Sequence, residues 1–346
     1  MAKKRYPGLF DSEFRMRKID TIGDPLKELN EKINWERFRP LLERGFSNDE
    51  EEKGPGGRPP YDLIIRFKTL LISELYNISD DMTEFLVNDR RTFQRFIGID
   101  DHDPVPDAKS IWNWREKLIK NKIFEKLLHK FYKILKESAI EFTSGSIVDA
   151  TFVEKPQQRN SRKENEAIKN GKIPEDWQKP GAENKLRQKD TDATWTKKHG
   201  KTYYGYKSHI KIDKKTKLII KTVVTTASVH DSQVLEDLID NTDAAKNVYG
   251  DSAYTGENNL KKILKHGGIP KINEKGYRGK PLTKQQIAKN KRLSRTRARV
   301  EHVFAYMERS MGRLWIRCVG IERAEARILF KSLIYNMMRF CILTRG

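Results

Sequence analysis

The spacing of apolar residues changes at Ser146, and this change constrains the fold more than any other feature of the 346-residue sequence. In residues 63–75 apolar side chains recur every three or four positions, which places them on one face of a helix. From Ser146 the period is two, and residues 146–153, 204–212 and 218–226 have the alternating or β-branched composition of strands. A further helix, strand and helix follow. The sequence therefore predicts a helical region that precedes a mixed α/β region.

Breaks in composition divide the chain into three predicted regions. Gly54-Pro55-Gly56-Gly57 follows an acidic run, and this density of Gly and Pro ends an N-terminal arm and linker of residues 1–57. Residues 58–143 are predicted to be helical, and residues 144–346 to form the mixed α/β region. For the helical region, the period alone does not choose between a helix-turn-helix domain and a plain helical bundle.

Local signals add detail to these regions. Asp80-Asp81 and Asp107 are predicted to cap helices in the helical region. Residues 154–202 are polar, rich in lysine and without a clear period, so we expect a basic insert that is mainly loop with one short helix. Residues 284–344 are predicted to form C-terminal helices. The last of these, from Glu322 to Thr344, has a wide apolar face that we expect to pack within one chain rather than between two.

The charge of the chain indicates a polyanionic partner. Its 69 Lys and Arg exceed its 48 Asp and Glu, which gives a formal net charge of +21. Residues 269–320 alone hold fourteen Lys or Arg against three acidic residues. Proteins with such an excess most often bind nucleic acid. Solubility or association with ribosomes is the alternative that composition leaves open.

Composition excludes other classes of protein. Cys318 and Cys341 are too few to staple a chain of this length or to hold zinc through four thiolates, which favours a reducing compartment. The most apolar tract, residues 328–343, is interrupted by Lys331, Asn336 and Arg339, so no membrane span is expected. Gly200-Lys201-Thr202 lacks the glycine that a phosphate-binding loop has five residues earlier, so we expect no nucleotide cofactor.

Three carboxylates have settings that suit chemistry. Asp149 lies within a predicted strand, where a half-buried carboxylate is costly unless it is paired, hydrogen-bonded or bound to metal. Asp251 directly follows the predicted strand 247–250, and Glu301 lies in a helix that is otherwise almost entirely basic. The simpler interpretations are that each aspartate caps a turn, and that Glu301 forms an i,i+4 pair with Arg297 worth about 0.2–0.5 kcal/mol.

Together the three carboxylates could hold two divalent ions. Carboxylates on adjacent strands and a helix can bind two ions about 3.5–4 Å apart, one activating the attacking oxygen and the other stabilising the leaving oxygen of a phosphodiester. All-oxygen ligation suits Mg²⁺ or Mn²⁺ rather than zinc. Spacing alone does not select this set, because 48 acidic residues offer many triples.

Six groups of residues follow one another from about residue 57 onwards. They are Gly57-Arg58-Pro59-Pro60-Tyr61; Val148-Asp149-Ala150-Thr151; Thr196-Lys197-Lys198-His199-Gly200-Lys201 with Tyr204-Gly205-Tyr206-Lys207; Val229-His230-Asp231-Ser232; Gly250-Asp251-Ser252-Ala253-Tyr254; and Arg297-Ala298-Arg299-Val300-Glu301-His302-Val303-Phe304. Each is modest alone. As an ordered set, they resemble the IS5-type family of insertion-sequence transposases.

The resemblance implies an RNase H-like catalytic core, a mixed sheet with flanking helices, preceded by an all-α, helix-turn-helix-like DNA-binding domain. Its Asp-Asp-Glu triad falls on Asp149, Asp251 and Glu301. Related enzymes carry a Tyr-Arg-Glu-Lys signature around the glutamate, in which Arg297 and Glu301 match. The tyrosine and lysine positions hold other residues, Ser294 and Glu308.

That departure makes Arg297 and Arg309 the candidates for holding phosphate at the element's end. Tyr206 to His209, and His230 with Asp231, are expected to border the site. The full set of basic residues expected to contact DNA is Arg115, Lys197, Lys198, Lys207, Arg295, Arg297, Arg299 and Arg309.

The sequence therefore predicts a cut-and-paste DNA transposase. The resemblance implies hydrolysis at the terminal inverted repeats with two Mg²⁺ or Mn²⁺ ions, followed by attack of the freed 3′-hydroxyl on target DNA. It also implies a homodimer in the DNA complex and a cytoplasmic, prokaryotic protein. One alternative is a related metal-dependent nuclease without strand transfer. The other is a non-catalytic DNA-binding derivative, against which three intact carboxylates argue.

Overall fold

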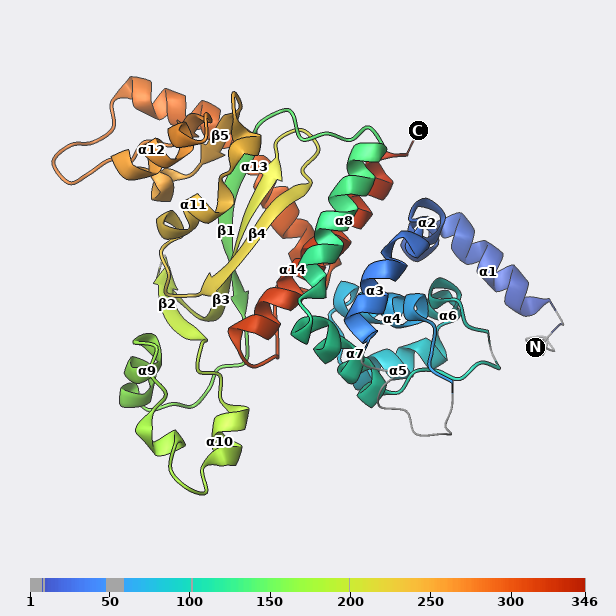
Figure 1. Cartoon of the computed structure of the whole chain (residues 1–346). Helices are drawn as coiled ribbons and strands as arrows, with labels where there is room; N and C mark the ends of the chain where they lie inside the picture. The colour runs from blue at the N-terminus through green and yellow to red at the C-terminus, as the bar shows by residue number, and fades with distance from the viewer. Residues whose placement is uncertain (1–7, 9, 48–58, 101, 199, 346) are drawn as a thin grey trace, which may run out of the picture.

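The computed structural model describes residues 8, 10–47, 59–100, 102–198 and 200–345 (Figure 1). The predicted break at Gly54–Gly57 and the acidic run before it lie outside the described residues. The described chain consists of a helical N-terminal region and a mixed β-sheet flanked by helices. None of its helices is both long and apolar enough to cross a membrane.

In the described part of the N-terminal region, all of the regular elements are helices. In chain order these are α1 (Asp11–Ile22), α2 (Pro25–Lys32), the 3₁₀ helix η1 (Trp35–Phe38), α3 (Arg39–Phe46), α4 (Leu63–Leu75), α5 (Asp80–Asp89), α6 (Arg91–Ile97), α7 (Ala108–Lys120) and α8 (Ile123–Glu137). As predicted, Asp107 caps α7, where it accepts the N–H of Ser110 at 2.7 Å. The capping prediction for Asp80-Asp81 is wrong. Ser79 caps α5 instead, because its Oγ accepts the N–H of the third residue of that helix at 3.2 Å.

Six strands form one mixed sheet. They are β1 (Ser146–Glu154), β2 (Thr194–Lys198), β3 (Lys201–Asp213), β4 (Ile219–Thr226), β5 (Asn247–Gly250) and β6 (Ile269–Ile272). Their order is β2-β3-β1-β5-β6, and β4 also pairs with β3. The strand β1 is antiparallel to β3 and parallel to β5, while β6 is parallel to β5. The two parallel pairings place the ends of β5 and β6 at the same edge as the second half of β1.

Helices cover both faces of this sheet (Figure 1). One face packs against α13 (Lys284–Ser310) and α14 (Ile321–Leu343), and the other against α11 (Leu235–Leu238) and α12 (Glu257–Lys265). Successive side chains of a strand point to opposite faces. Accordingly, Ile147 shares a buried cluster with Val300 of α13, whereas Val148 shares one with Leu235 and Ile263. The remaining 3₁₀ helices of this half are η4 (Asp231–Val234), η5 (Asn241–Asp243) and η6 (Ser252–Tyr254).

The C-terminal helix α14 connects the helical region to the sheet. Its Phe330 ring lies 5.8 Å from that of Phe67 in α4 and 4.8 Å from that of Phe124 in α8. On its other side, the Asn336 amide bonds both the N–H and the C=O of Ile219 in β4, each at 2.8 Å. The apolar face of this helix therefore packs within the chain, as predicted.

The insert is more ordered than its composition predicted. It contains α9 (Arg162–Lys169), η3 (Glu175–Trp177) and α10 (Glu183–Gln188), and its last residues form β2. The expectation of a loop with one short helix is therefore wrong. Trp177 is almost fully buried and donates its indole N–H to Glu164, so the insert has a small core. A buried ion pair between Lys155 and Asp190 joins its two ends.

Candidate active site

The strands β1 and β5 carry two of the predicted carboxylates at one level of the sheet. Their parallel register sets Ser146 opposite Val248. Counting three residues on from this pair in both strands brings Asp149 level with Asp251, which directly follows the end of β5. This is the edge of a parallel sheet at which α/β proteins bind their ligands. By alternation, Asp149 lies on the face covered by α13.

The carboxylate of Asp149 is largely buried, and only 17% of its side chain is exposed. Its Oδ1 accepts the N–H of Ala150 at 2.8 Å, and its Oδ2 accepts from Nη2 of Arg297 at 3.2 Å. Burial raises the pKa of the Asp149 carboxyl. The charge of Arg297 opposes this effect, and the negative charge of Asp251 adds to it. A buried carboxylate next to a second one is typical of a functional site rather than of a structural pair.

The setting of Asp251 is different, because it also caps a turn. Its Oδ1 accepts the N–H of Ala253 at 2.8 Å at the start of η6. The simpler interpretation, a turn-capping aspartate, therefore holds for Asp251 but not for Asp149, which lies within its strand. The second oxygen of Asp251 has no hydrogen-bond donor among the described residues, so it is available to a ligand.

From α13, Arg297 reaches Asp149. The two side chains are almost equally buried, with 16% and 17% exposed. The predicted i,i+4 pair between Glu301 and Arg297 is wrong, since the guanidinium pairs across to the sheet instead. The Nε of Arg297 is buried and has no acceptor among the described residues.

The third predicted carboxylate is not gathered with the other two. Glu301 is exposed, one helical turn beyond Arg297 on α13. Among the described residues, the three carboxylates do not form a group of metal-ligating atoms within 4.8 Å of one another. The structure thus places Asp149 and Asp251 at one level and leaves Glu301 outside such a group.

A tyrosine lies among the acidic residues, and its importance was not apparent in the sequence. The ring of Tyr254 is fully buried, and its hydroxyl has no hydrogen-bond partner in the described part of the chain. Burial, together with the negative charges of Asp149, Asp231 and Asp251, raises the pKa of this hydroxyl well above its ordinary value. The position of Tyr254, three residues after Asp251 in a short turn, was the signal that could have indicated it.

On the opposite side of Tyr254, Asp231 and Lys207 form a buried pair. The Lys207 ammonium donates to Asp231 at 2.9 Å and to the carbonyl of Val229 at 2.6 Å. Nearby, His209 is buried and its Nε2 lies 2.9 Å from the Thr225 hydroxyl. These residues border the acidic group as the sequence predicts, but the Lys207 ammonium is occupied within the protein.

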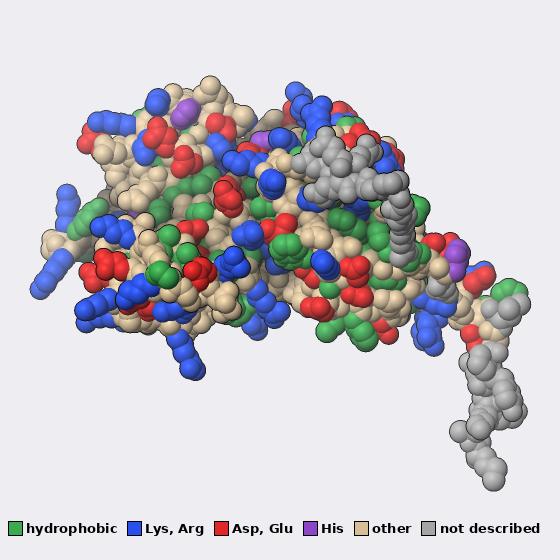
Figure 2. Space-filling model, turned by 60° about the horizontal axis from the view of Figure 1, so that its bottom comes forward, with side chains coloured by type: hydrophobic (Ala, Val, Ile, Leu, Met, Phe, Trp, Pro, Cys, Tyr) green, Lys and Arg blue, Asp and Glu red, His purple; other side chains and the backbone are tan. Residues whose placement is uncertain are grey.

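The other predicted DNA-contacting residues divide by exposure. Arg115 is mostly buried and makes two hydrogen bonds to Asp80, at 2.8 and 2.5 Å. Five are exposed: Lys197, Lys198, Arg295, Arg299 and Arg309. On the face in Figure 2, Lys and Arg side chains project among acidic ones and do not gather into one patch. Charge on that face alone therefore does not locate DNA.

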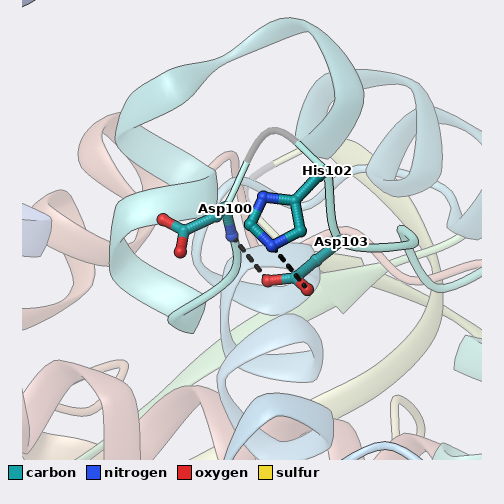
Figure 3. A group of neighbouring side chains, drawn as sticks. All are labelled: Asp100, His102 and Asp103. Carbon is teal, nitrogen blue, oxygen red and sulfur yellow. Dashed lines mark hydrogen bonds and ion pairs between the residues drawn. The ribbon is translucent and has the colours of Figure 1, made fainter.

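A second group of possible metal ligands lies in the helical region. Asp100, His102 and Asp103 are within 4.8 Å of one another by their ligand atoms, and all are exposed (Figure 3). Asp103 accepts the N–H of Asp100 at 2.9 Å, which is the bonding of a turn. Exposed acidic side chains in a turn require no metal, so this group has a structural explanation.

Comparison with known families shows which family the chain belongs to. Residues 140–337 match the family model described as the transposase DDE domain, and residues 14–117 match that of a transposase domain (DUF772). The first match spans the sheet, both aspartates and α13, more than half of the chain. The chain therefore belongs to the transposase DDE domain family.

One solved structure extends the comparison. The chain is similar to the piggyBac transposase synaptic complex with hairpin DNA, at 12% sequence identity and a TM-score of 0.47. The similarity covers 93% of this chain and 75% of the other.

Proposed function

We propose that this transposase is of the IS5 type and that it cuts and joins DNA at Asp149, Asp251 and Glu301 on an RNase H-like core. One observation carries the proposal: Asp149 and Asp251 lie level on adjacent parallel strands. The half-buried Asp149 also has the raised pKa of a functional carboxyl. Glu301 is the third carboxylate in this proposal, on the helix that already reaches the site through Arg297.

The chemistry of the three side chains, rather than their spacing in this structure, suits a divalent-metal site. The donors are carboxylate oxygens, which suit Mg²⁺ or Mn²⁺. The buried Tyr254 hydroxyl beside them has no hydrogen-bond partner among the described residues, and a water bound at the site could supply one. Asp149, Asp251 and Glu301 would hold the metal. Two such ions, when bound, activate the attacking oxygen and stabilise the leaving oxygen of a phosphodiester.

The chain's own residues would then position the DNA. Exposed Arg295, Arg299 and Arg309 extend along α13, and Lys197 and Lys198 lie at the end of β2. We propose that they hold the phosphate backbone while the element's end is hydrolysed and its 3′-hydroxyl is transferred to target DNA. Two ends require two sites, so a homodimer is part of the proposal, as is a helical domain, residues 58–143, that binds the terminal inverted repeats.

The test replaces Asp149 with asparagine. Asp149→Asn keeps the shape of the side chain but removes its charge, so cleavage of a duplex carrying the DNA that flanks the gene, with Mg²⁺ present, should fall below detection. Asp237→Asn is the matched control, because Asp237 is exposed and should retain wild-type cleavage. Persistent cleavage by the Asp149 variant would mean that the triad is misassigned.

The products of the wild-type reaction distinguish the alternatives. Joining of the cleaved end to a target plasmid is expected of a transposase. Cleavage without joining would indicate a metal-dependent nuclease. Sequence-selective binding with neither reaction would indicate a non-catalytic DNA-binding derivative.

A further inference from the structure

We propose that Arg297 is the internal counter-ion of the metal-free site, and that its guanidinium exchanges Asp149 for a DNA phosphate once a divalent ion is bound. This inference rests on the proposed function, because it takes Asp149 as a metal ligand. It assigns Arg297 two successive partners and makes metal binding and DNA binding depend on each other.

The first observation is competition for one atom. The Oδ1 of Asp149 accepts the N–H of Ala150 within the same strand, so Oδ2 is the oxygen that this backbone contact leaves free. Arg297 occupies that same Oδ2 from α13. A divalent ion bound to Oδ2 would weaken the hydrogen bond from Arg297, because the ion draws on the negative charge of the same oxygen.

The second observation is that the pair is loosely made. Arg297 reaches Asp149 through one hydrogen bond of 3.2 Å, and its buried Nε has no acceptor among the described residues. By contrast, Arg115 makes two bonds of 2.8 and 2.5 Å to Asp80. When a planar guanidinium uses so few of its donors, attraction between the charges holds it more than directional hydrogen bonding does. Such a pair exchanges partners more readily than a bidentate one.

The third observation explains why the site needs a cation when no metal is bound. Asp149 is largely buried, with 17% of its side chain exposed, and the register of β1 and β5 brings it level with the second carboxylate, Asp251. An uncompensated carboxylate in such a place destabilises the fold. Arg297 supplies the compensating charge, which a divalent ion would supply instead.

A coupling between metal and DNA follows. When a divalent ion neutralises Asp149, Arg297 is released with its donors free, and a phosphate is the acceptor that suits a guanidinium. Each ligand then raises the affinity for the other by the same factor, as linkage requires. The enzyme would bind its metal and its DNA strand together rather than one at a time.

The experiment compares Arg297→Gln with Arg292→Gln. The control residue lies on the same helix, is exposed, and is not among the residues proposed to contact metal or DNA, so both variants lose the same charge. Calorimetry without DNA should show that Arg297→Gln binds Mn²⁺ about fivefold or more tightly than Arg292→Gln, the lower end of typical coupling. In a chelator, Arg297→Gln should melt at a lower temperature than the control, because Asp149 has lost its counter-ion.

The opposite signs of these two effects make the test decisive. A merely structural Arg297 would lower the melting temperature and leave Mn²⁺ affinity equal or weaker, which would overturn the inference. If wild type binds Mn²⁺, and Asp149→Asn abolishes this binding while Arg297→Gln leaves it unchanged, only the counter-ion role fails. If neither wild type nor Arg297→Gln binds Mn²⁺, the proposed function fails and this inference fails with it.

The coupling has its own readout. In wild type, Ca²⁺ should raise the affinity for a duplex carrying the element's end, and this gain should shrink in Arg297→Gln but not in the control, Arg292→Gln. An equal gain in all three proteins would contradict the exchange of partners.

Discussion

At the scale of single residues, surroundings rather than residue type decide what a charged side chain can do. Lys207 and Arg297 look alike in the sequence as basic residues near the site. Lys207 makes two bonds within the protein, to Asp231 and to the carbonyl of Val229, whereas Arg297 makes one to Asp149. The partners of Lys207 come from a segment more than twenty residues away, so no local pattern could have predicted its burial.

The pH dependence of stability is expected to report on His209. Burial lowers the pKa of this imidazole to about 4, from an ordinary value of 6.5. The unfolded chain therefore takes up a proton between pH 6.5 and 4 that the folded chain does not. The contribution of neutral His209 to the free energy of unfolding is thus fully present above pH 6.5 and is lost as the pH falls. The loss at pH 4 is about 3 kcal/mol from this group.

Urea unfolding at a series of pH values would measure this loss. His209→Gln should show a flatter decline between pH 6.5 and 4, whereas His302→Gln, at an exposed position on α13, should follow wild type. Parallel declines in all three proteins would argue that His209 titrates normally.

At the scale of elements, strands with a local apolar pattern were predictable and strands without one were not. The strand from Ser146 and the strand 247–250 were predicted from their apolar residues. Asp149 was flagged because it interrupts the first strand, and Asp251 because it directly follows the second. The strand β6 was not predicted, because Pro270 and Lys271 interrupt its apolar residues. The strand β2 exists only because β3 pairs with it, and such pairing is not local information.

The same reasoning explains what could not be foreseen about α13. Its sequence predicted a basic helix, but not which of its residues faces β1. Arg297 and Glu301 lie one turn apart on the same face of the helix, so a shift of one turn along the helix axis decides which of them meets Asp149. That position is fixed by the tertiary packing of Val300 and Val303. The sequence could therefore name the helix that completes the site, but not the contact.

The helix α14 offers a direct test of how elements are joined. Asn336 is fully buried and satisfies both backbone groups of Ile219 at the start of β4. Asn336→Ala would leave an N–H and a C=O buried without partners, and we expect a loss of about 2–4 kcal/mol in the free energy of unfolding. Asn184→Ala, at an exposed position in the insert, should cost far less. Similar values for the two variants in urea unfolding would show that water replaces the lost bonds.

At the scale of the whole molecule, one large core links regions that the sequence treated separately. Buried residues of the N-terminal helices, of the sheet and of α14 belong to a single cluster. The predicted arm included residues 25–46, whose helices contribute Leu29 and Phe38 to it. Long-range packing of this kind leaves no trace in local composition, so the division into residues 1–57, 58–143 and 144–346 stays a prediction.

The net charge of +21 gives the final prediction, because only some of it is available to DNA. Arg299 and Arg309 are exposed, whereas Arg115 is bound to Asp80 inside the helical region. Affinity for DNA should fall steeply with salt, and each lost phosphate contact should reduce the slope of log K against log salt by about 0.9. Arg299→Gln and Arg309→Gln should each reduce the slope, and Arg115→Gln should leave it unchanged while lowering stability.

Salt titrations of binding by fluorescence anisotropy would measure this, and a smaller slope in the Arg115 variant would mean that its pair with Asp80 opens on DNA. The total charge favours a polyanionic partner, but the pairing of each arginine decides which charges would be available to it.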